Sequence, residues 1–478
     1  MTINLHMFDK TIKLILILLA IFTPIAIGSM EIWAFSLMEL SILLVIILGM
    51  SQKIIWRSPP SLPHHKDLKI RNQILLISGI MLSVYLGLIF VQTIPLPPGL
   101  LKVLSPKTYD LLQSLAIKNS SGELITPGFR ISLFPFATKI ELFKWLTLAG
   151  FFVFLLSWEP QNRDWISTSL VIPIIFVGVF ESLYGMFEFF SGHHHILYLD
   201  ESHWVSAVTG TFINRNYFAG YLSMVIPLSI GFLFFRESLH GIKHMGWRHR
   251  LSLLDGKTLL IGFCVIVMIL GLLLSASRMG ITSLLASFTV MSLLFKDPKK
   301  RAKHSKAPVL ILALAILWSV WIGLDAVISR FFTASEDFMS RWRIWVDTFK
   351  IIKDFPIFGS GLGTFTWVFP MYQTSHILGH RTHAENDYLQ LTSEVGLLGI
   401  ILATVLFLFL LFRAISGIRS LSPNNSQRYI ALGAMVGILA LMFHSIAERN
   451  IQVPSNAFLY TILWAMVLRV SIHSEFKK

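Results

Sequence analysis

The sequence has 478 residues, of which 54% are hydrophobic and only 14% are charged, and its mean hydropathy is +0.68. Because a soluble domain carries about 25% charged residues, this composition excludes a soluble globular protein and predicts an integral membrane protein. The formal net charge is +14, but the basic residues cluster beside apolar segments. That placement is typical of membrane topology, so we expect no nucleic-acid partner.

Apolar segments of about 20 residues, long enough to cross a bilayer as helices, recur along the whole sequence. The short alternating segments of a membrane β-barrel are not evident, and backbone groups in lipid must be hydrogen-bonded within each helix. We therefore expect one all-α membrane domain over residues 1–478. The sequence predicts about twelve transmembrane helices, near 12–29, 32–50, 72–93, 140–158, 165–190, 216–235, 258–275, 279–295, 308–326, 394–412, 429–446 and 455–472.

Lysine and arginine gather in the connections that follow the even-numbered segments. These residues are Lys53, Arg57, Lys66, Lys69 and Arg71; Arg236, Lys243, Arg248, Arg250 and Lys257; Lys296, Lys299, Lys300, Arg301, Lys303 and Lys306; and Arg413, Arg419 and Arg428. Since positively charged loops stay on the cytoplasmic side, we expect these connections and both termini in the cytoplasm. The odd-numbered connections are then external.

Two external connections are long, at 94–138 and 327–393, and connections of this length are usually functional or disordered. Apolar residues in the second recur every three or four positions, at Phe338, Trp342, Trp345, Phe349 and Ile352. This spacing predicts an amphipathic helix. We expect that helix either to lie on the outer membrane surface or to pack as a cap on the helical bundle.

A glycine-rich turn follows at Gly359, Gly361 and Gly363. Glycine permits a tight turn or a close approach of the backbone. A phosphate-binding loop would need a preceding strand and a following helix N-terminus. The pattern predicts neither, so we do not expect a nucleotide site there.

A dense polar cluster at residues 382–390 precedes the tenth predicted helix. A histidine, two carboxylates and two amides at this position could supply a general base and its orienting partners. His383 and Glu385 would not share a face on a helix but could do so on an extended turn. The alternative is that an exposed loop is polar only for solubility.

Two further polar patches lie at the same predicted level, at 210–220 and at 275–280, the very short turn between the seventh and eighth segments. Arg278 in this turn could simply extend to lipid headgroups. Alternatively, several arginines converge there, and guanidinium groups bind phosphate oxygens in pairs. Arginines beside a general base would suit a lipid-linked phosphate or pyrophosphate.

Some histidines and carboxylates give weaker patterns. His193, His194 and His195 are consecutive, so their side chains point apart and a metal site is not expected. His444 and Glu448 are four residues apart near the outer end of the eleventh predicted helix, beside Arg449. They could form an acid–base pair or a structural ion pair.

Charge is scarce inside the predicted helices, apart from Glu181 and Glu188 in the fifth. A proton relay would need more such groups on several helices, and transporters tend to place polar groups at mid-bilayer. A transporter or flippase of lipid-linked glycans is therefore the rival class of function, and a non-catalytic scaffold is a third. Cys264 is the single cysteine, so no intramolecular disulfide can form.

Taken together and in this order, three patches resemble the O-antigen ligase and polymerase superfamily of bacterial envelope enzymes. The patches are Gly210 to Leu222, Ser275 to Gly280, and Arg341-x3-Trp345 with Pro356-x2-Gly359-x-Gly361-x-Gly363 and His383 to Gly399. The resemblance covers roughly residues 165–450, and the first 160 residues match only in topology.

The resemblance implies a transferase in the bacterial inner membrane with its active site on the periplasmic face. Such enzymes move a glycan from undecaprenyl pyrophosphate to an acceptor hydroxyl. The acceptor is the lipid A core in ligases, a growing polysaccharide in polymerases, or a protein serine. We expect a ligase, with an O-antigen or exopolysaccharide polymerase as the alternative, and we expect neither a cofactor nor a metal requirement.

The resemblance also assigns roles to residues of this sequence. His383 is the expected base, with Glu385 beside it, and the expected pyrophosphate clamp is Arg278, Arg215 and Arg341. Further site candidates are Asn214, Asn216, Asn386 and Tyr388. One departure leaves alternatives open, because many relatives have His-Asn where this sequence has Glu385-Asn386. Either His383 is the base and Glu385 orients it, or Glu385 is itself the base, or the site is altered.

Overall fold

The computed structural model describes residues 2–55, 65–115, 117–118, 124–125, 128–162, 164–192, 195–200, 207–239, 255–294, 334–374, 381–422 and 425–472. Over these residues the chain is an all-α membrane protein, as the sequence predicts. Eight of its described helical segments are long and apolar enough to cross a bilayer. They are α2 (Ile32–Ile55), α3 (His65–Thr93), α6 (Pro135–Ser157), α7 with α8 (Trp165–Thr168 and Val171–Ser191), α9 (Arg215–Leu239), α11 (Gly256–Leu274), α17 (Asp387–Ser420) and α18 (Gln427–His444).

Three more predicted spans also coincide with helices. These are α1 (Thr2–Ile25), the shorter apolar helix α12 (Arg278–Leu294) and α19 (Pro454–Ile472). The ninth predicted span, 308–326, lies outside the described residues. The count of twelve transmembrane helices therefore stays a prediction.

Helix α9 forms the centre of the bundle. It packs most extensively against α18, and also against α11, α8, α12 and α19. The backbones of α9 and α18 approach closely where Gly231 faces Gly433, and a Cβ atom at Gly433 would lie 2.4 Å from the carbonyl oxygen of Pro227. Small residues allow such close packing in membrane helices, so these glycines fix the distance between the two central helices.

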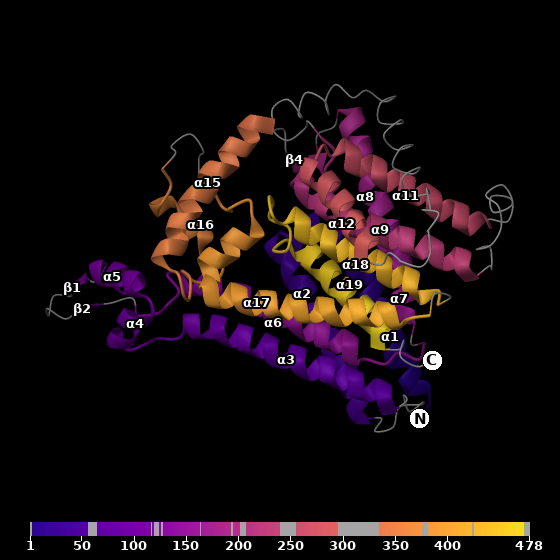
Figure 1. Ribbon diagram of the computed structural model, residues 1–478, viewed down its shortest axis with the longest axis horizontal. Coiled ribbons are helices and arrows are strands. Elements are labelled where there is room, and N and C mark those ends of the chain that lie inside the picture. Colours follow the sequence, from indigo (N-terminus) through magenta and orange to yellow (C-terminus); the bar gives the residue numbers. More distant parts are fainter. Residues whose placement is uncertain are drawn as a thin grey trace.

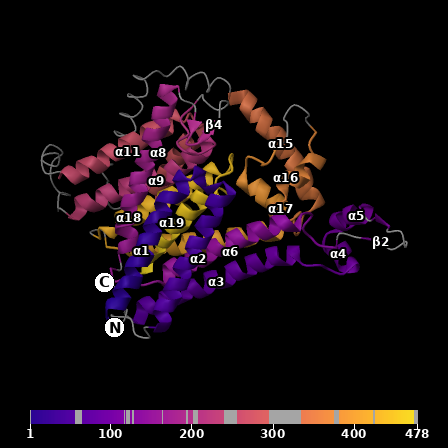
Figure 2. The same ribbon diagram turned by 180° about the vertical axis from the view of Figure 1, so that it is seen from behind.

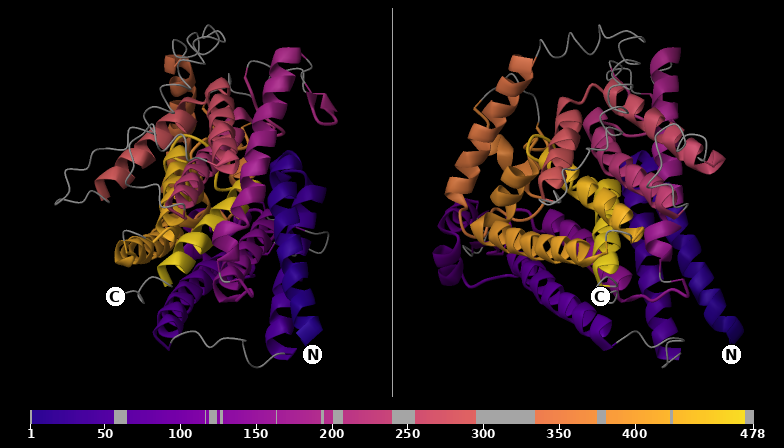
Figure 3. Two further views of the ribbon diagram at one scale, coloured as in Figure 1. Left: turned by 90° about the vertical axis from the view of Figure 1, so that its right-hand side faces the viewer. Right: turned by 45° about the vertical axis from the view of Figure 1, so that its right-hand side comes forward.

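Helices α3, α6 and α17 run side by side, and α15 (Ala334–Asp354) and α16 (Phe365–Val368) lie at one end of α17 (Figure 1). The view from behind shows the same arrangement (Figure 2). Both chain termini lie toward the end of the bundle away from α15 (Figure 3).

The described parts of the two long connections contain helices and short strands. The first contains α4 (Pro98–Leu104), α5 (Pro106–Ser114) and the antiparallel strands β1 (Ile117–Lys118) and β2 (Leu124–Ile125). The second contains α15, α16 and the 3-10 turn η3 (Phe369–Met371). Another 3-10 turn, η1 (Ile27–Ser29), follows α1, and β3 (His195–Ile196) pairs antiparallel with β4 (Leu199–Asp200).

Helix α17 begins at Asp387, seven residues before the predicted span. The side chain of Asn386 caps it by accepting a hydrogen bond from the Leu389 backbone N–H at 3.0 Å, and the acidic Asp387 in the first turn favours the positive end of the helix dipole. Gly396 interrupts the helix with φ +69°. Part of the polar cluster at 382–390 is therefore helical.

The side of helix α15 that is buried differs from the apolar side that the spacing predicts. Ile344 and Ile351 are buried, whereas Trp342 and Phe349 are 47% and 53% exposed. Trp345 is half-buried because its indole N–H donates to the Ala384 carbonyl at 3.1 Å. The helix thus packs on the loop before α17 through a different face, and part of its predicted apolar face is left exposed.

The glycine-rich turn is a packing turn that joins α3 to α17. The Gln92 side chain donates to the Phe358 carbonyl at 2.7 Å and the Glu394 carbonyl at 3.0 Å, and it accepts from the Leu362 N–H at 3.1 Å. At Gly361, with φ +113°, a Cβ atom would lie 2.4 Å from Ser132 Oγ. These contacts bind the turn to α3 and to α17, and they place it against Ser132.

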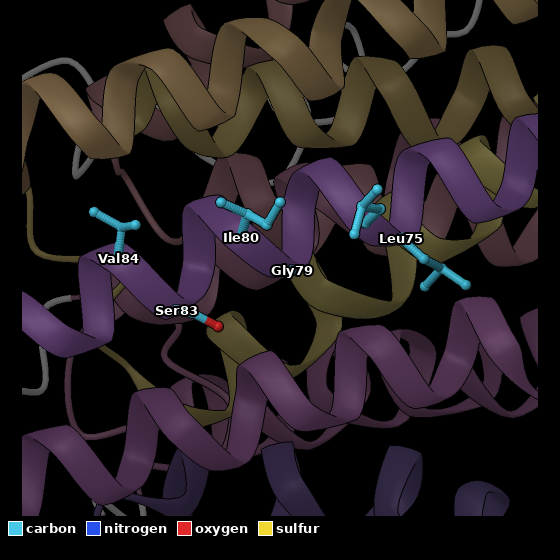
Figure 4. A pocket seen from close by; sticks show the side chains of 6 residues that line it. Leu75, Gly79, Ile80, Ser83 and Val84 are labelled. Atoms are coloured by element: carbon cyan, nitrogen blue, oxygen red, sulfur yellow. The ribbon is translucent and has the colours of Figure 1, made fainter.

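A shallow groove of about 460 Å³ runs along α3 (Figure 4). Its lining residues are Leu75, Leu76, Gly79, Ile80, Ser83 and Val84. Because none of these residues is ionisable, the groove does not have the chemistry to hold a charged substrate group.

Candidate functional site

Polar side chains from four separate elements meet at the end of the bundle that carries α15. The elements are the first turn of α9, helix α15, the loop at 381–386 and the α18–α19 turn at 445–453. Asn216 Nδ2 of α9 donates to Glu448 Oε1 of the turn at 2.6 Å, and Arg341 of α15 forms an ion pair with the same oxygen. Arg449, next in the turn, hydrogen-bonds to His383 of the loop.

The start of α9 is held by hydrogen bonds to the neighbouring helix α8 and to the residue that precedes the helix. Glu181 of α8 is fully buried and accepts hydrogen bonds from the Thr211 N–H at 2.7 Å and hydroxyl at 2.8 Å. Asn214 Oδ1 then accepts the Asn216 N–H at 2.8 Å, which starts the helix. Because the backbone at Asn216 is held in this way, its side chain is directed to Glu448.

Asp387 fixes the α18–α19 turn against α17. One of its carboxylate oxygens, Oδ2, accepts the backbone N–H groups of Asn450 and Ile451, both at 2.8 Å, and its own N–H donates to the Ser445 carbonyl at 3.0 Å. The Tyr388 hydroxyl donates to the Met442 carbonyl at 2.7 Å. These bonds place the loop at 381–386 directly beside Glu448 and Arg449.

Glu448 is the centre of the cluster and is only 1% exposed. The Glu385 carboxyl lies near it, close enough to act on it electrostatically. Burial raises the pKa of Glu448 well above its ordinary value; Arg341 opposes this shift and the neighbouring Glu385 adds to it. Glu385 itself has φ +51°, a conformation that disfavours side chains and often marks functional positions.

His383 is held as a neutral ring. Burial, with the positive charges of Arg449 and Lys144 acting in the same direction, lowers its pKa to about 2. Since guanidinium groups only donate, Nε2 must accept from Arg449 and the ring hydrogen is assigned to Nδ1. In this arrangement His383 has no lone pair left to accept a proton from a substrate.

The structure gives the three predicted clamp arginines different positions. Arg341 enters the cluster through its ion pair with Glu448. Arg215 and Arg278 are the first residues of α9 and α12, and these helix starts lie together because a Cβ atom at Gly280 would lie 2.8 Å from Ala219 Cβ. The helix N-termini add partial positive charge at this end of the bundle.

The four remaining candidates divide between the cluster and its support. Asn216 contacts Glu448 directly. Asn214 and Asn386 stabilise the starts of α9 and α17, and Tyr388 anchors α17 to α18. These three are therefore positioned to shape the site without entering the cluster.

The sequence indicates Glu448 and Arg449 only weakly as site residues, whereas the structure places both in the polar cluster. The spacing of His444 and Glu448 suggests one helical face, but α18 ends at His444 and Glu448 lies in the following turn. Glu448 pairs there with Arg341 instead of His444. The signal in the sequence is two adjacent charged residues between apolar segments.

No group of three or more His, Cys, Asp or Glu side chains among the described residues is arranged to hold a metal ion. His193 and His194 lie outside those residues, and His195 lies in β3. Independence from metal stays a prediction.

Residues 263–404 match the family model described as O-antigen ligase. The matched segment runs from α11 into α17 and includes Arg278, Arg341, His383 and Glu385. Asn216 and Glu448, which meet Arg341, lie outside it. No curated protein matches the chain.

Proposed function

Because the match over residues 263–404 places this chain in the O-antigen ligase and polymerase superfamily, we propose that it transfers a glycan from undecaprenyl pyrophosphate to a hydroxyl of the lipid A core. The reaction takes place at the periplasmic face of the bacterial inner membrane. The observation that carries the proposal is the cluster of Arg341, Glu448, Glu385 and Asn216, in which residues of the matched segment meet helix α9 and the α18–α19 turn, both outside that segment.

The cluster offers the groups that this chemistry needs. The acceptor oxygen attacks the anomeric carbon while a base takes its proton, and the bond from that carbon to the pyrophosphate oxygen breaks. Glu385 is the better base of the two loop candidates, because the His383 lone pair is engaged by Arg449. Arg341, with Arg215 and Arg278 at the neighbouring helix starts, would offset the charge on the departing pyrophosphate.

Reconstitution tests the proposal directly. The purified protein in liposomes receives a glycan linked to undecaprenyl pyrophosphate and a lipid A core acceptor, and the product is followed by gel and mass spectrometry. We expect glycan on the core with the wild-type protein and with Glu188→Gln, a carboxyl variant on α8 outside the cluster, and strongly reduced product with Glu385→Gln. Movement of the lipid-linked glycan across the bilayer without a new glycosidic bond would instead identify a transporter or flippase.

Deletion in the native host separates the members of the superfamily. Loss of the O-antigen ladder on the core, with lipid-linked polymer still made, identifies a ligase. Single repeats on the core identify a repeat-unit polymerase, and an intact ladder with lost secreted polymer identifies an exopolysaccharide enzyme. We expect the first pattern. Treatment of the reconstituted protein with EDTA should leave transfer unchanged, and an EDTA-sensitive reaction would contradict metal independence.

A further inference from the structure

The backbone on both sides of Ala384 is held by side chains from two different helices. The Ala384 N–H donates to Gln390 Oε1 of α17 at 3.1 Å, and the Ala384 carbonyl accepts from the indole N–H of Trp345 of α15 at 3.1 Å. The Ala384 side chain is fully buried and belongs to an apolar cluster with residues of α15 and α16. Both peptide groups next to Ala384 are therefore fixed in place.

The amide of Gln390 has a defined orientation. Gln390 is buried, and its Nε2 donates to Glu394 Oε1 at 3.3 Å and to Gln452 Oε1 at 3.1 Å. If the amide were turned over, its oxygen would face these two oxygens and its NH2 group would face the Ala384 N–H, which is also a donor. The hydrogen-bond network therefore directs Gln390 Oε1 toward Ala384.

Glu385 follows Ala384 directly and has a strained backbone. Its φ angle is +51°, and a side chain in this conformation costs about 1–3 kcal/mol and persists only where the surrounding structure imposes it. On the other side of Glu385, the Asp387 N–H donates to the Ser445 carbonyl at 3.0 Å. The strained residue thus lies between two anchored backbone positions, which set the direction in which its side chain leaves the loop.

Helix α15 connects this backbone to Arg341. Arg341 and Trp345 are four residues apart, so they lie one turn apart on the same side of the helix. Arg341 forms the ion pair with Glu448, and Trp345 binds the Ala384 carbonyl. One helical turn therefore sets the position of the backbone next to Glu385 relative to the guanidinium group of Arg341.

We propose that Trp345 and Gln390 are positioning residues, which hold the Ala384 backbone so that the Glu385 carboxylate meets the acceptor hydroxyl at a fixed distance from Arg341. This inference rests on the proposed transfer function. Both residues act through Glu385 and not on the substrate itself. A general base must lie within hydrogen-bonding reach of the proton that it removes, and a displacement of about 1 Å can lower a rate about 100-fold. Loosening the Ala384 backbone therefore slows proton removal and leaves donor binding intact.

Steady-state kinetics of the reconstituted transfer reaction test the positioning role. Trp345→Phe keeps an aromatic ring and removes the N–H donor, and Gln390→Met keeps the length of the side chain and removes the amide. Each should lower kcat by about tenfold or more, while KM for the undecaprenyl-linked donor stays within about threefold of wild type. Trp342→Phe makes the same change on the exposed side of α15 and should leave both constants unchanged. A raised KM with an unchanged kcat would overturn the proposal, because it would place these residues in donor binding.

A double-mutant cycle with Glu385→Gln separates positioning from general stabilisation of the site. If Trp345 and Gln390 act only by placing the Glu385 carboxylate, they have nothing to place once it is removed. In the Glu385→Gln background, Trp345→Phe and Gln390→Met should then change the residual rate by less than about twofold. Effects that multiply with that of Glu385→Gln would show that the two residues do not act through Glu385.

Hydrogen–deuterium exchange of the segment that contains Ala384 tests the held backbone without requiring turnover. We expect faster exchange than in wild type for Gln390→Met, which frees the Ala384 N–H, and for Trp345→Phe, which frees the neighbouring carbonyl. Trp342→Phe should exchange like wild type. Exchange at the wild-type rate in both Gln390→Met and Trp345→Phe would contradict the held backbone.

Two further comparisons keep the result interpretable. If Gln390→Met fails to assemble, because Glu394 and Gln452 lose their shared donor, Trp345→Phe decides the outcome alone. A protein in which the variants speed exchange as expected, but which transfers no glycan, refutes the proposed function and leaves the held backbone standing. A protein that transfers glycan, but in which the variants multiply with Glu385→Gln, refutes the positioning role alone.

Discussion

Arg449 donates a hydrogen bond to Nε2 of His383. This contact occupies the lone pair of the histidine and so distinguishes it from Glu385, the other candidate base in the loop before α17. The histidine is neutral and binds a cation, whereas Glu385, two residues later, forms no ion pair among the described residues and lies near the Glu448 carboxyl. The ring of His383 therefore has a supporting role: it holds Arg449 and, through it, the α18–α19 turn.

The first prediction concerns these two residues. Glu385→Gln should lower the rate of glycan transfer by about 10²- to 10⁴-fold, the usual contribution of a general base. His383→Gln keeps a hydrogen-bond acceptor for Arg449 and should stay within about tenfold of wild type, because the base is intact. The reconstituted transfer assay measures both. Full activity in Glu385→Gln with loss in His383→Gln would reverse the assignment.

The second prediction concerns acid stability. The pKa of His383 is lowered to about 2 in the folded protein, against about 6.5 for an unfolded histidine. Between these values the unfolded chain binds more protons, so the folding stability falls as the pH drops below about 6.5, by at most about 1.4 kcal/mol per pH unit. Above that pH the effect vanishes.

His383→Gln removes this titration. Its apparent melting temperature in detergent should therefore fall less than that of wild type between pH 7 and pH 5. Parallel curves for the two proteins would show that the histidine is not kept neutral by burial. Glu188→Gln serves as the control, and its curve should follow wild type.

The third prediction concerns the ion pair between Arg341 and Glu448. Arg341→Met leaves a buried carboxyl without its cation, and the loss of one partner of a buried pair costs on the order of 3 kcal/mol. The double variant Arg341→Met with Glu448→Gln should recover most of this loss, because no uncompensated charge remains. The single variant should be less destabilised at pH 5 than at pH 8, since Glu448 can then be protonated. Equal melting temperatures for the single and double variants would argue against a stabilising ion pair.

The fourth prediction concerns the break in α17. At Gly396 the φ angle is +69° and a Cβ atom would lie 2.1 Å from the Ile357 carbonyl oxygen. Gly396→Ala should therefore lower the free energy of unfolding by about 2 kcal/mol or more, from backbone strain and steric overlap. Gly79→Ala on α3 is the matched control, because nothing lies within 4 Å of its Cβ position. Its stability should change by less than about 1 kcal/mol, in the favourable direction for a helix. Equal effects of the two substitutions would contradict the packing described at Gly396.

The positions of most apolar helices could be predicted from the sequence, because the length of an apolar segment depends on local composition alone. Segments such as 32–50 and 72–93 coincide with α2 and α3, and the short turn before Arg278 is present between α11 and α12. The start of α17 was placed too late because hydropathy does not register the cap at Asn386. The spacing predicted the helix at α15, but it could not show that Ile344 and Ile351 would be the buried residues, because that depends on the loop before α17 against which the helix packs.

The candidate site was only partly visible in the sequence. Arg341 and Glu385 follow from the motifs, but their meeting with Glu448 depends on the packing of α15 against a turn 107 residues later in the chain. No local pattern encodes such a contact. The adjacent charges Glu448 and Arg449 were noticeable, yet only the fold shows that they face different partners.

The three hydrogen bonds of Gln92 have a consequence for protein engineering. This residue belongs to α3, outside the segment that matches the family model, yet it binds both the glycine-rich turn and the backbone of α17. The N-terminal helices are therefore not an interchangeable module. A chimera that takes its first 160 residues from a relative should assemble correctly only when the donor supplies an equivalent amide at this position, and restoring that one side chain should rescue a chimera that lacks it.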